Sequence, residues 1–473
     1  MVFSSALFLT LFLPLVLVSY YLVRENLRVY LLLVASLFFY AWGEPKAIFC
    51  MLAMIVVNYC AAILIDKGVI SFFGRNVTRF ASSKSILVTC ILFDLSSLFF
   101  YKYLNFTILN VNSLFSTSWE IPGIALPIGI SFYCFQCLSY VVDVYRGNVP
   151  AQTKLSRLAL YISFFPQLIA GPIVRYVDVY LDLDNRKLDW NNCFYGFQRF
   201  AVGLAKKVLI ADPMGLMADK VFSIPPSELS FLWAWIGIVC YGLQIFYDFS
   251  AYSDMAIGLG RVFNLHFLEN FKYPYGADSV QDFWRKWHIS LSSWLRDYVY
   301  IPLGGSRISP FRTLCNVWIV FLLCGIWHGA EWTFVIWGIW HGFGLTIERL
   351  GFSKVLQRMP YVLRNLWVFL FVSIGWVFFR SPDVAYSFDF IKTMLFLGNQ
   401  PSFWDAIPAY EHLTISWLLS LVVGILFAYP RINMFISSMK STRLIGVLSF
   451  LLFVFAYIFA VTSTFSPFIY FRF

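Results

Sequence analysis

Long uncharged apolar runs alternate with short polar segments along most of the chain. Clear runs cover residues 1–23, 29–43, 47–65, 121–142, 158–174, 229–247, 313–330, 332–347, 365–379, 413–430 and 444–471, and weaker ones lie near 85–101 and 193–211. Because a helix needs roughly 20 apolar residues to cross a bilayer, the pattern predicts an all-α integral membrane protein with about 11–13 transmembrane and re-entrant helices.

The two ends of this pattern and its organisation carry further expectations. Residues 1–23 lack both a basic start and a small-residue cleavage motif, so we expect a retained first transmembrane helix rather than a signal peptide. Runs 313–330 and 332–347 are separated by Glu331 alone, which predicts a tight hairpin or a helix that enters the membrane and returns. We find no repeats or linkers, and therefore expect a single membrane domain over residues 1–473.

Composition narrows the class of protein. Of 473 residues, 60% are hydrophobic and 13% are charged, whereas soluble domains carry about 25% charged residues. This excludes a soluble enzyme, a disordered regulator and a nucleic-acid binder, so we expect membrane lipids and no nucleic acid among the partners. The nine cysteines are scattered through apolar runs, and we expect neither a metal site nor a disulfide framework.

The net charge of +10 is explained by basic residues in loops on one side of the membrane. Loops 24–28, 66–84 and 143–157 together hold nine lysines and arginines, whereas loops 43–46 and 102–120 hold two. Because cytoplasmic loops are the basic ones, the N-terminus is predicted to face outward. Loop 431–443 is also basic, which makes it cytoplasmic and places the C-terminus on the outer face.

One stretch, residues 248–312, breaks the apolar pattern with thirteen charges in 65 positions. Polar groups at membrane depth are costly and usually face a cavity or a partner. Here aromatic residues alternate with Arg285, Lys286, Arg296 and Arg307. The same pattern suits a membrane-interface layer and a pocket for a nucleotide phosphate, because arginine and lysine neutralise phosphate. The residues alone leave both interpretations open.

Three histidines are candidates for chemistry. His328 ends an uncharged run in LCGIWHGAEW, and Gly325 and Gly329 beside it allow close approach of a backbone or a ligand. A neutral imidazole there is suited to act as a general base. His341 lies in a second W-H-G thirteen residues later, and His288 lies in the charged stretch. A lone histidine in an apolar helix is more often a core residue than a catalyst, and we apply that interpretation to His341.

Several long motifs agree in order with one known family. The tracts YDFSAYSDMAIGLG (247–260) and FWRKWHISLSSWLRDYVYIPLGG (283–305), and WHGA at 327–330, resemble the membrane-bound O-acyltransferases. The similar branch is the bacterial one that includes the alginate and peptidoglycan O-acetyltransferases. LPIGISFYCFQCLSYVVDVYRG near 126–147 and FFPQLIAGPIVR at 164–175 fit the same branch.

This resemblance implies a ring of tilted helices around a thinned central funnel, with a polar catalytic region at 248–345. It implies acetyl-CoA as a cytoplasmic acyl-donor substrate and no permanently bound cofactor. The motif histidine of W-H-G-A falls on His328 and that of R-x-W-H-I-S on His288, so both are expected to be catalytic. Arg285 and Arg296 match motif positions, and contact with the phosphates of CoA is our hypothesis for them.

The outer-face tail, residues 464–473, ends in FIYFRF. The resemblance implies that Tyr470 is an acyl relay; the alternative is an aromatic anchor at the membrane interface. A phenol pKa near ~10 lies between those of a thiol and an alkyl alcohol. A phenyl ester should therefore lie between a thioester and a sugar ester in transfer potential, which favours the relay.

The expected reaction is O-acetylation of a polysaccharide outside the bacterial cytoplasmic (inner) membrane. The outer loops are too short to hold a glycan, so we expect an extracytoplasmic serine-esterase-like O-acetyltransferase as a partner. Peptidoglycan, alginate and other exopolysaccharides remain open as acceptors. The alternatives are a D-alanyl, lipid or protein acyltransferase of the same family and a polysaccharide exporter, although an exporter should spread its polar residues over many helices.

Overall fold

The chain is described by a computed structural model that covers residues 2–72, 75–78, 81–183, 189–397, 401–402, 411–430, 442–462 and 468. Seven helices in this part of the chain are long and apolar enough to cross a membrane: Glu25–Gly43, Ile48–Asp66, Ser83–Phe115, Phe231–Val262, Pro310–His328, Tyr361–Arg380 and Leu444–Thr462. Two shorter apolar helices cover Phe8–Leu22 and Ile415–Phe427. The predicted all-α membrane class is therefore confirmed.

The chain divides into two compact units. One consists of Met1–Phe200 with Met255–Leu268, and the other of Ala201–Asp254 with Glu269–Phe473. Helix α12 (Phe231–Val262) contributes residues to both units. The expected single domain, the ring and its central funnel stay predictions.

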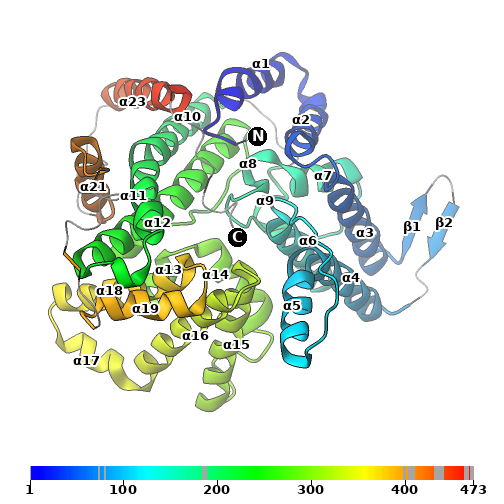
Figure 1. Cartoon of the computed structure of the whole chain (residues 1–473). Helices are drawn as coiled ribbons and strands as arrows, with labels where there is room; N and C mark the ends of the chain where they lie inside the picture. The colour runs from blue at the N-terminus through cyan, green and yellow to red at the C-terminus, as the bar shows by residue number, and fades with distance from the viewer. Residues whose placement is uncertain are drawn as a thin grey trace. The chain divides into compact units, whose positions relative to one another are not determined.

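The first unit contains ten α-helices in the described residues, of which α3 is the longest at 19 residues. Its helices are α1 (Leu13–Leu22), α2 (Arg28–Gly43), α3 (Ile48–Asp66), α4 (Ser83–Leu98), α5 (Leu104–Phe115), α6 (Ile130–Tyr145), α7 (Leu155–Ser163), α8 (Phe165–Leu168), α9 (Tyr176–Val179) and α10 (Trp190–Ala205), the last of which continues into the second unit. Helices α3, α4 and α6 pack against one another, and Figure 1 shows them side by side. Between α3 and α4 lies an antiparallel hairpin of β1 (Val69–Phe72) and β2 (Arg75–Thr78), which adds two strands to the helical fold.

Two predicted spans in this unit are wrong. Run 121–142 is helical only from Ile130 onward, and run 158–174 breaks after Ser163. Both runs are apolar, but each contains prolines and glycines, such as Pro127 and Pro166. Proline lacks the N–H that a helix requires, and it disfavours the helical conformation of the residue before it, so neither run forms one continuous helix.

The second unit contains both motif histidines. Its helices are α11 (Asp212–Phe222), most of α12, α13 (Val280–Lys286), α14 (Ile289–Leu295), α15 (Pro310–His328), α16 (Trp332–Ile347), α17 (Ser353–Arg358), α18 (Tyr361–Arg380), α19 (Val384–Met394), α21 (Ile415–Phe427) and α23 (Thr442–Thr462). Helix α12 continues from apolar run 229–247 into the polar stretch, so Asp248 and Asp254 lie on a membrane-length helix.

Helices α15 and α16 form the tight hairpin that the sequence predicts. They pack along each other and are joined by three residues. Glycines bring the backbones together: a Cβ at Gly325 would collide with the carbonyl oxygen of Phe334, and one at Gly338 with that of Phe321. Gly325 therefore serves the close approach of a second backbone, one of the two roles expected for it.

We expect Gly338→Ala to destabilise the protein by about 1–3 kcal/mol, the usual cost of overpacking, because a methyl group there meets backbone that has little freedom to move. Thermal unfolding in detergent measures this effect. The matched control is Gly342→Ala on the same helix, where the nearest atoms to an added Cβ are side-chain carbons at 3.5 Å. Equal melting temperatures for the two variants would contradict the assigned role of Gly338.

Candidate functional site

Helix α13 carries one edge of the site and is held at its N-terminus by two side chains. The Ser279 hydroxyl accepts a hydrogen bond from the backbone N–H of Asp282 at 3.0 Å. The Glu348 carboxylate accepts from the N–H of Val280 at 2.6 Å and of Gln281 at 3.0 Å. These bonds satisfy N–H groups that the first turn of a helix leaves without partners. The end of α16 thus fixes the start of α13.

His288 lies between α13 and α14 in a left-handed conformation, with φ of 44°, and its side chain is fully buried. Asn270 sets the ring's tautomer. The Asn270 carbonyl oxygen accepts from the backbone N–H of Ser290 at 3.2 Å, which fixes the orientation of the amide. The same oxygen lies 3.2 Å from His288 Nδ1, so Nδ1 carries the proton. The lone pair then lies on Nε2, and neutral His288 can act as a base from that atom.

Burial lowers the pKa of His288 to about 3. The imidazole is therefore neutral at physiological pH, which is the state that a proton acceptor requires.

His328 ends α15 inside an aromatic cage. The rings of Trp327, Trp337 and Phe379 lie edge-on to it, with centroids at 5.0, 5.0 and 5.1 Å. The Trp327 indole also lies 6.1 Å from the ring of His288. The structure thus brings both motif histidines into contact with one tryptophan.

His341 lies on α16 and accepts a hydrogen bond from the Trp284 indole, whose N–H donates to Nδ1 at 3.2 Å. Its neutral form therefore carries the proton on Nε2, the reverse of His288. Trp284 belongs to α13, so this bond is a second link between α16 and α13. The geometry supports the prediction that His341 is structural.

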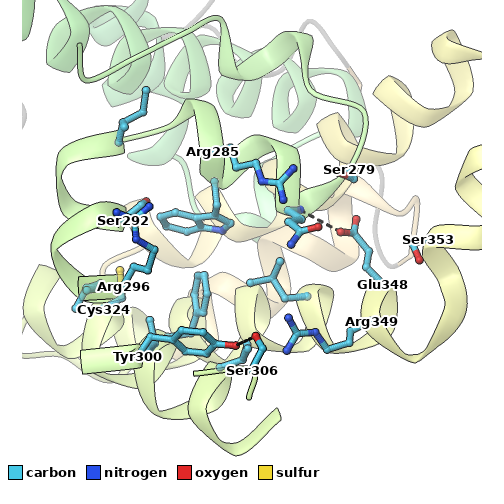
Figure 2. A pocket seen from close by; sticks show the side chains of 18 of the residues that line it. Ser279, Arg285, Ser292, Arg296, Tyr300, Ser306, Cys324, Glu348, Arg349 and Ser353 are labelled. Carbon is cyan, nitrogen blue, oxygen red and sulfur yellow. Dashed lines mark hydrogen bonds between the residues drawn. The ribbon is translucent and has the colours of Figure 1, made fainter. Parts of the chain in front are cut away.

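A pocket of about 790 Å³ lies beside these residues (Figure 2). Both predicted phosphate-contact residues, Arg285 of α13 and Arg296, line it. Arg349 and Arg364 line it as well, so four arginines face two carboxylates, those of Asp278 and Glu348. Further polar groups come from serines 279, 292, 293, 306 and 353. Such a lining suits an anionic ligand of nucleotide size.

Two of the arginines are available for a ligand. Arg364 is paired with Asp278 at 2.8 Å, and Arg296 with Asp297 at 2.6 Å. Within the residues that the structure describes, Arg285 and Arg349 form no ion pair. Figure 2 shows their guanidinium groups on the pocket wall near Glu348.

The pocket is connected to both histidines along the helices that line it. Ile289, at the start of α14, lines it and directly follows His288. Cys324 of α15 lines the pocket. It precedes His328 by four residues, so the two residues lie about one turn apart on the same face of the helix. Neither histidine lines the pocket itself; the nearest lining residues in the chain are Ile289, which follows His288, and Cys324, one helical turn before His328.

Sequence reasoning missed Glu348, Arg349 and the specific role of Asn270. Glu348 directly follows the apolar run that forms α16, where the sequence resembles an ordinary helix end. Burial raises the pKa of Glu348, and the two backbone N–H donors act in the opposite direction. No local pattern indicates that this carboxylate reaches a helix 67 positions earlier.

Tyr470 lies outside the described residues. Phe468, two positions earlier, is described and is buried. Its ring lies against Tyr252 of α12, with centroids 5.2 Å apart. The expected placement of Tyr470 on the outer face stays a prediction.

Comparison with known proteins identifies the family of this chain. A sequence model of the membrane-bound O-acyltransferase family matches residues 150–388. The chain is 42% identical over 407 residues to the protein named probable alginate O-acetylase AlgI of Pseudomonas aeruginosa, covering 84% of this chain and 76% of that one. It is 34% identical over 435 residues to a peptidoglycan O-acetyltransferase of Helicobacter pylori, covering 84% and 80%. A teichoic acid D-alanyltransferase of Bacillus subtilis is 27% identical over 273 residues, covering 54% and 68%.

Acid should destabilise the protein through His288. In the unfolded chain a histidine keeps a pKa near ~6.5, whereas in the folded state it is about 3. Between these values the unfolded state binds more protons, so stability falls as the pH falls. At pH 5 this amounts to about 2 kcal/mol relative to pH 8.

Melting temperatures at pH 8, 6 and 5 test this expectation. His288→Gln, which does not titrate, should lose less stability on acidification than the wild type does. His412→Gln, at a half-buried position, is the control and should behave as the wild type. The same acid sensitivity in His288→Gln and the wild type would count against the assignment.

Proposed function

Because this chain belongs to the membrane-bound O-acyltransferase family, we propose that it takes acetyl from cytoplasmic acetyl-CoA and passes it across the membrane for O-acetylation of an extracytoplasmic polysaccharide. One observation supports the proposal: an arginine-lined pocket is formed in part by α14 and α15, the helices next to His288 and ending at His328. A donor with a charged nucleotide end and a reactive thioester end fits that arrangement.

The pocket accounts for the charged end of the donor. CoA carries phosphates, and guanidinium groups bind phosphate in a planar, two-point geometry. We assign this contact to Arg285, as its motif position suggests, and to Arg349, which is equally available. Arg296 contributes charge at the same wall. The thioester then extends past Cys324 towards His328.

The two histidines have separate tasks. His328 removes the hydroxyl proton of the nucleophile as its oxygen attacks the thioester carbonyl carbon. The C–S bond breaks, and the leaving thiolate takes that proton back from the imidazole as free CoA. His288, neutral with its lone pair on Nε2, takes no part in this proton transfer and accepts a hydrogen bond from another donor group of the substrates. Both imidazole rings contact the Trp327 indole.

We assign the nucleophile to the phenol of Tyr470. Tyr252, which contacts Phe468, lies three residues after Phe249 on α12, and the Phe249 ring lies 4.6 Å from that of His288. Residues three apart on a helix are neighbours on one face. The chain two residues before Tyr470 therefore lies about one helical turn from the His288 contact, which supports a relay through the tail.

The acetyl group then passes to a serine of an extracytoplasmic esterase-like partner and from there to a glycan hydroxyl. Relatives named for alginate and peptidoglycan acetylation support a polysaccharide acceptor, and we place the protein in the bacterial inner membrane. D-alanyl transfer is the alternative within the family. The lower identity and coverage of the teichoic acid D-alanyltransferase favour acetyl.

Donor binding predicts a dependence on the nucleotide. Arg285→Ala and Arg349→Ala should each raise the KM for acetyl-CoA about tenfold, because each removes a charge-assisted hydrogen bond. With S-acetylpantetheine, which lacks the nucleotide, neither variant should change the KM. Arg312→Ala, at an exposed position on α15, is the control. Equal effects on both donors would place the phosphates elsewhere.

The relay predicts a covalent intermediate. Wild-type protein in detergent with labelled acetyl-CoA should gain a base-labile acetyl group on the C-terminal peptide, whereas His328→Ala and Tyr470→Phe should not. In cells, Tyr470→Phe should abolish glycan acetylation.

Other outcomes are equally informative. CoA release without tyrosine label would mean direct transfer to the partner. Loss of both in folded protein would revive the exporter alternative, and full glycan acetylation by Tyr470→Phe would rule out the relay.

A further inference from the structure

Two lysines and three aspartates form a buried charge cluster in the second unit. Lys207 Nζ lies 2.8 Å from Asp212 and 2.6 Å from Asp248. The side chains of Lys207 and Asp248 are each 2% exposed. Beside this group, Lys206 Nζ lies 2.6 Å from Asp254. Burying ions in a membrane protein is costly, and such groups are typically kept where they serve a function.

An aromatic ring covers the cluster. The Phe468 ring lies over the ammonium of Lys207, with Nζ 4.5 Å from the centroid. On another side the ring meets Tyr252 edge-on, and Phe468 is only 1% exposed. A cation is attracted to the negative face of an aromatic ring, and the attraction grows when water is excluded, as it is here.

The position of this ring relates the cluster to the catalytic residues. Tyr252 and Phe249 share one face of α12, and Phe249 contacts the ring of His288. Helix α12 also supplies Ser253, whose hydroxyl accepts from the amide of Asn270, the residue that orients His288. Within the five positions from Phe249 to Ser253, α12 therefore contacts Phe468, His288 and Asn270.

The chain connection limits where Tyr470 can lie. Tyr470 follows Phe468 by only two residues in the chain. Holding the ring of Phe468 therefore restricts the freedom of the tail that follows it, which lowers the entropic cost of bringing nucleophile and donor together.

We propose that Lys207, held by Asp212 and Asp248, and Tyr252 form a seat for the ring of Phe468, and that this seat positions the C-terminal tyrosine for acetyl transfer. The inference rests on the proposed relay and adds the residues that hold it in place. Phe468 and Lys207 are positioning residues, since they act through Tyr470 and not on the acetyl group. The function of the charge cluster is then to hold the buried ammonium of Lys207 against the ring of Phe468.

The competing explanation is simple packing, in which any apolar side chain of similar size would fill the space. The two explanations differ in electrostatics. Each fluorine atom added to a phenylalanine ring withdraws electrons and weakens the negative electrostatic potential over the ring face, while the shape of the ring changes little. Phe468→Leu removes the aromatic ring altogether and keeps an apolar side chain.

The test replaces Phe468 with mono-, di- and trifluorophenylalanine by nonsense suppression in the full chain. Single-turnover labelling of Tyr470 by labelled acetyl-CoA is followed in time. We expect the labelling rate to fall with each fluorine and to be about tenfold lower for trifluorophenylalanine and for Phe468→Leu. Binding of a thioether analogue of acetyl-CoA, which is unable to transfer its acetyl group, should not change.

The matched control is the same series at Phe455 on α23, which is 52% exposed and should show no effect. Wild-type labelling rates in the Phe468 series and in Phe468→Leu would overturn the seat in favour of simple packing. A parallel fall in analogue binding would also overturn it, because Phe468 would then support the fold as a whole. If Tyr470→Phe keeps glycan acetylation, the relay itself fails; if it abolishes acetylation while the fluorinated series is silent, only the seat fails.

Discussion

The candidate site depends on the attachment of the short helix α13 to α16 at two points. Glu348 binds the first N–H groups of α13, and His341 accepts the indole N–H of Trp284 in its middle. A seven-residue helix has too few internal hydrogen bonds to hold its own position, so these links decide where its side chains lie. This attachment fixes the positions of Trp284 and Arg285, which both line the pocket.

The same principle extends to the opposite wall. Helix α16 is set against α15 by the close glycine contact at Gly325 and Gly338, and α15 ends on His328. The hairpin therefore holds the catalytic candidate at one end and α13 at the other. A pocket assembled from short helices keeps its shape because one rigid hairpin positions them. In this unit, the geometry of the site therefore depends directly on how these helices pack.

Polar groups in the second unit are arranged so that each buried charge meets a partner. Asp248 and Asp254 lie on a membrane-length helix and pair with Lys207 and Lys206, and the Glu348 carboxylate meets backbone N–H groups. The neutral His288 needs no counter-charge, since Asn270 fixes its tautomer by a hydrogen bond. A neutral imidazole at His288 suits an apolar setting, where a standing charge would be costly.

Apolar run length, motif order and charge placement determined much of this protein from the sequence alone. They predicted the all-α membrane class and the α15–α16 hairpin, because helix length is a local property, and motif order singled out Arg285 and Arg296, which line the pocket. The roles assigned to His288 and His328 stay predictions. Two proline-containing runs misled the same reasoning, since hydropathy does not measure backbone geometry.

Only the tertiary structure decided which distant residues meet. Asn270 reaches His288, Glu348 reaches α13 and Lys207 reaches both Asp248 and Phe468. Each pair joins segments separated along the chain, and its formation depends on how helices pack. Packing is set by many weak contacts summed over whole surfaces, and no short stretch of sequence contains that sum.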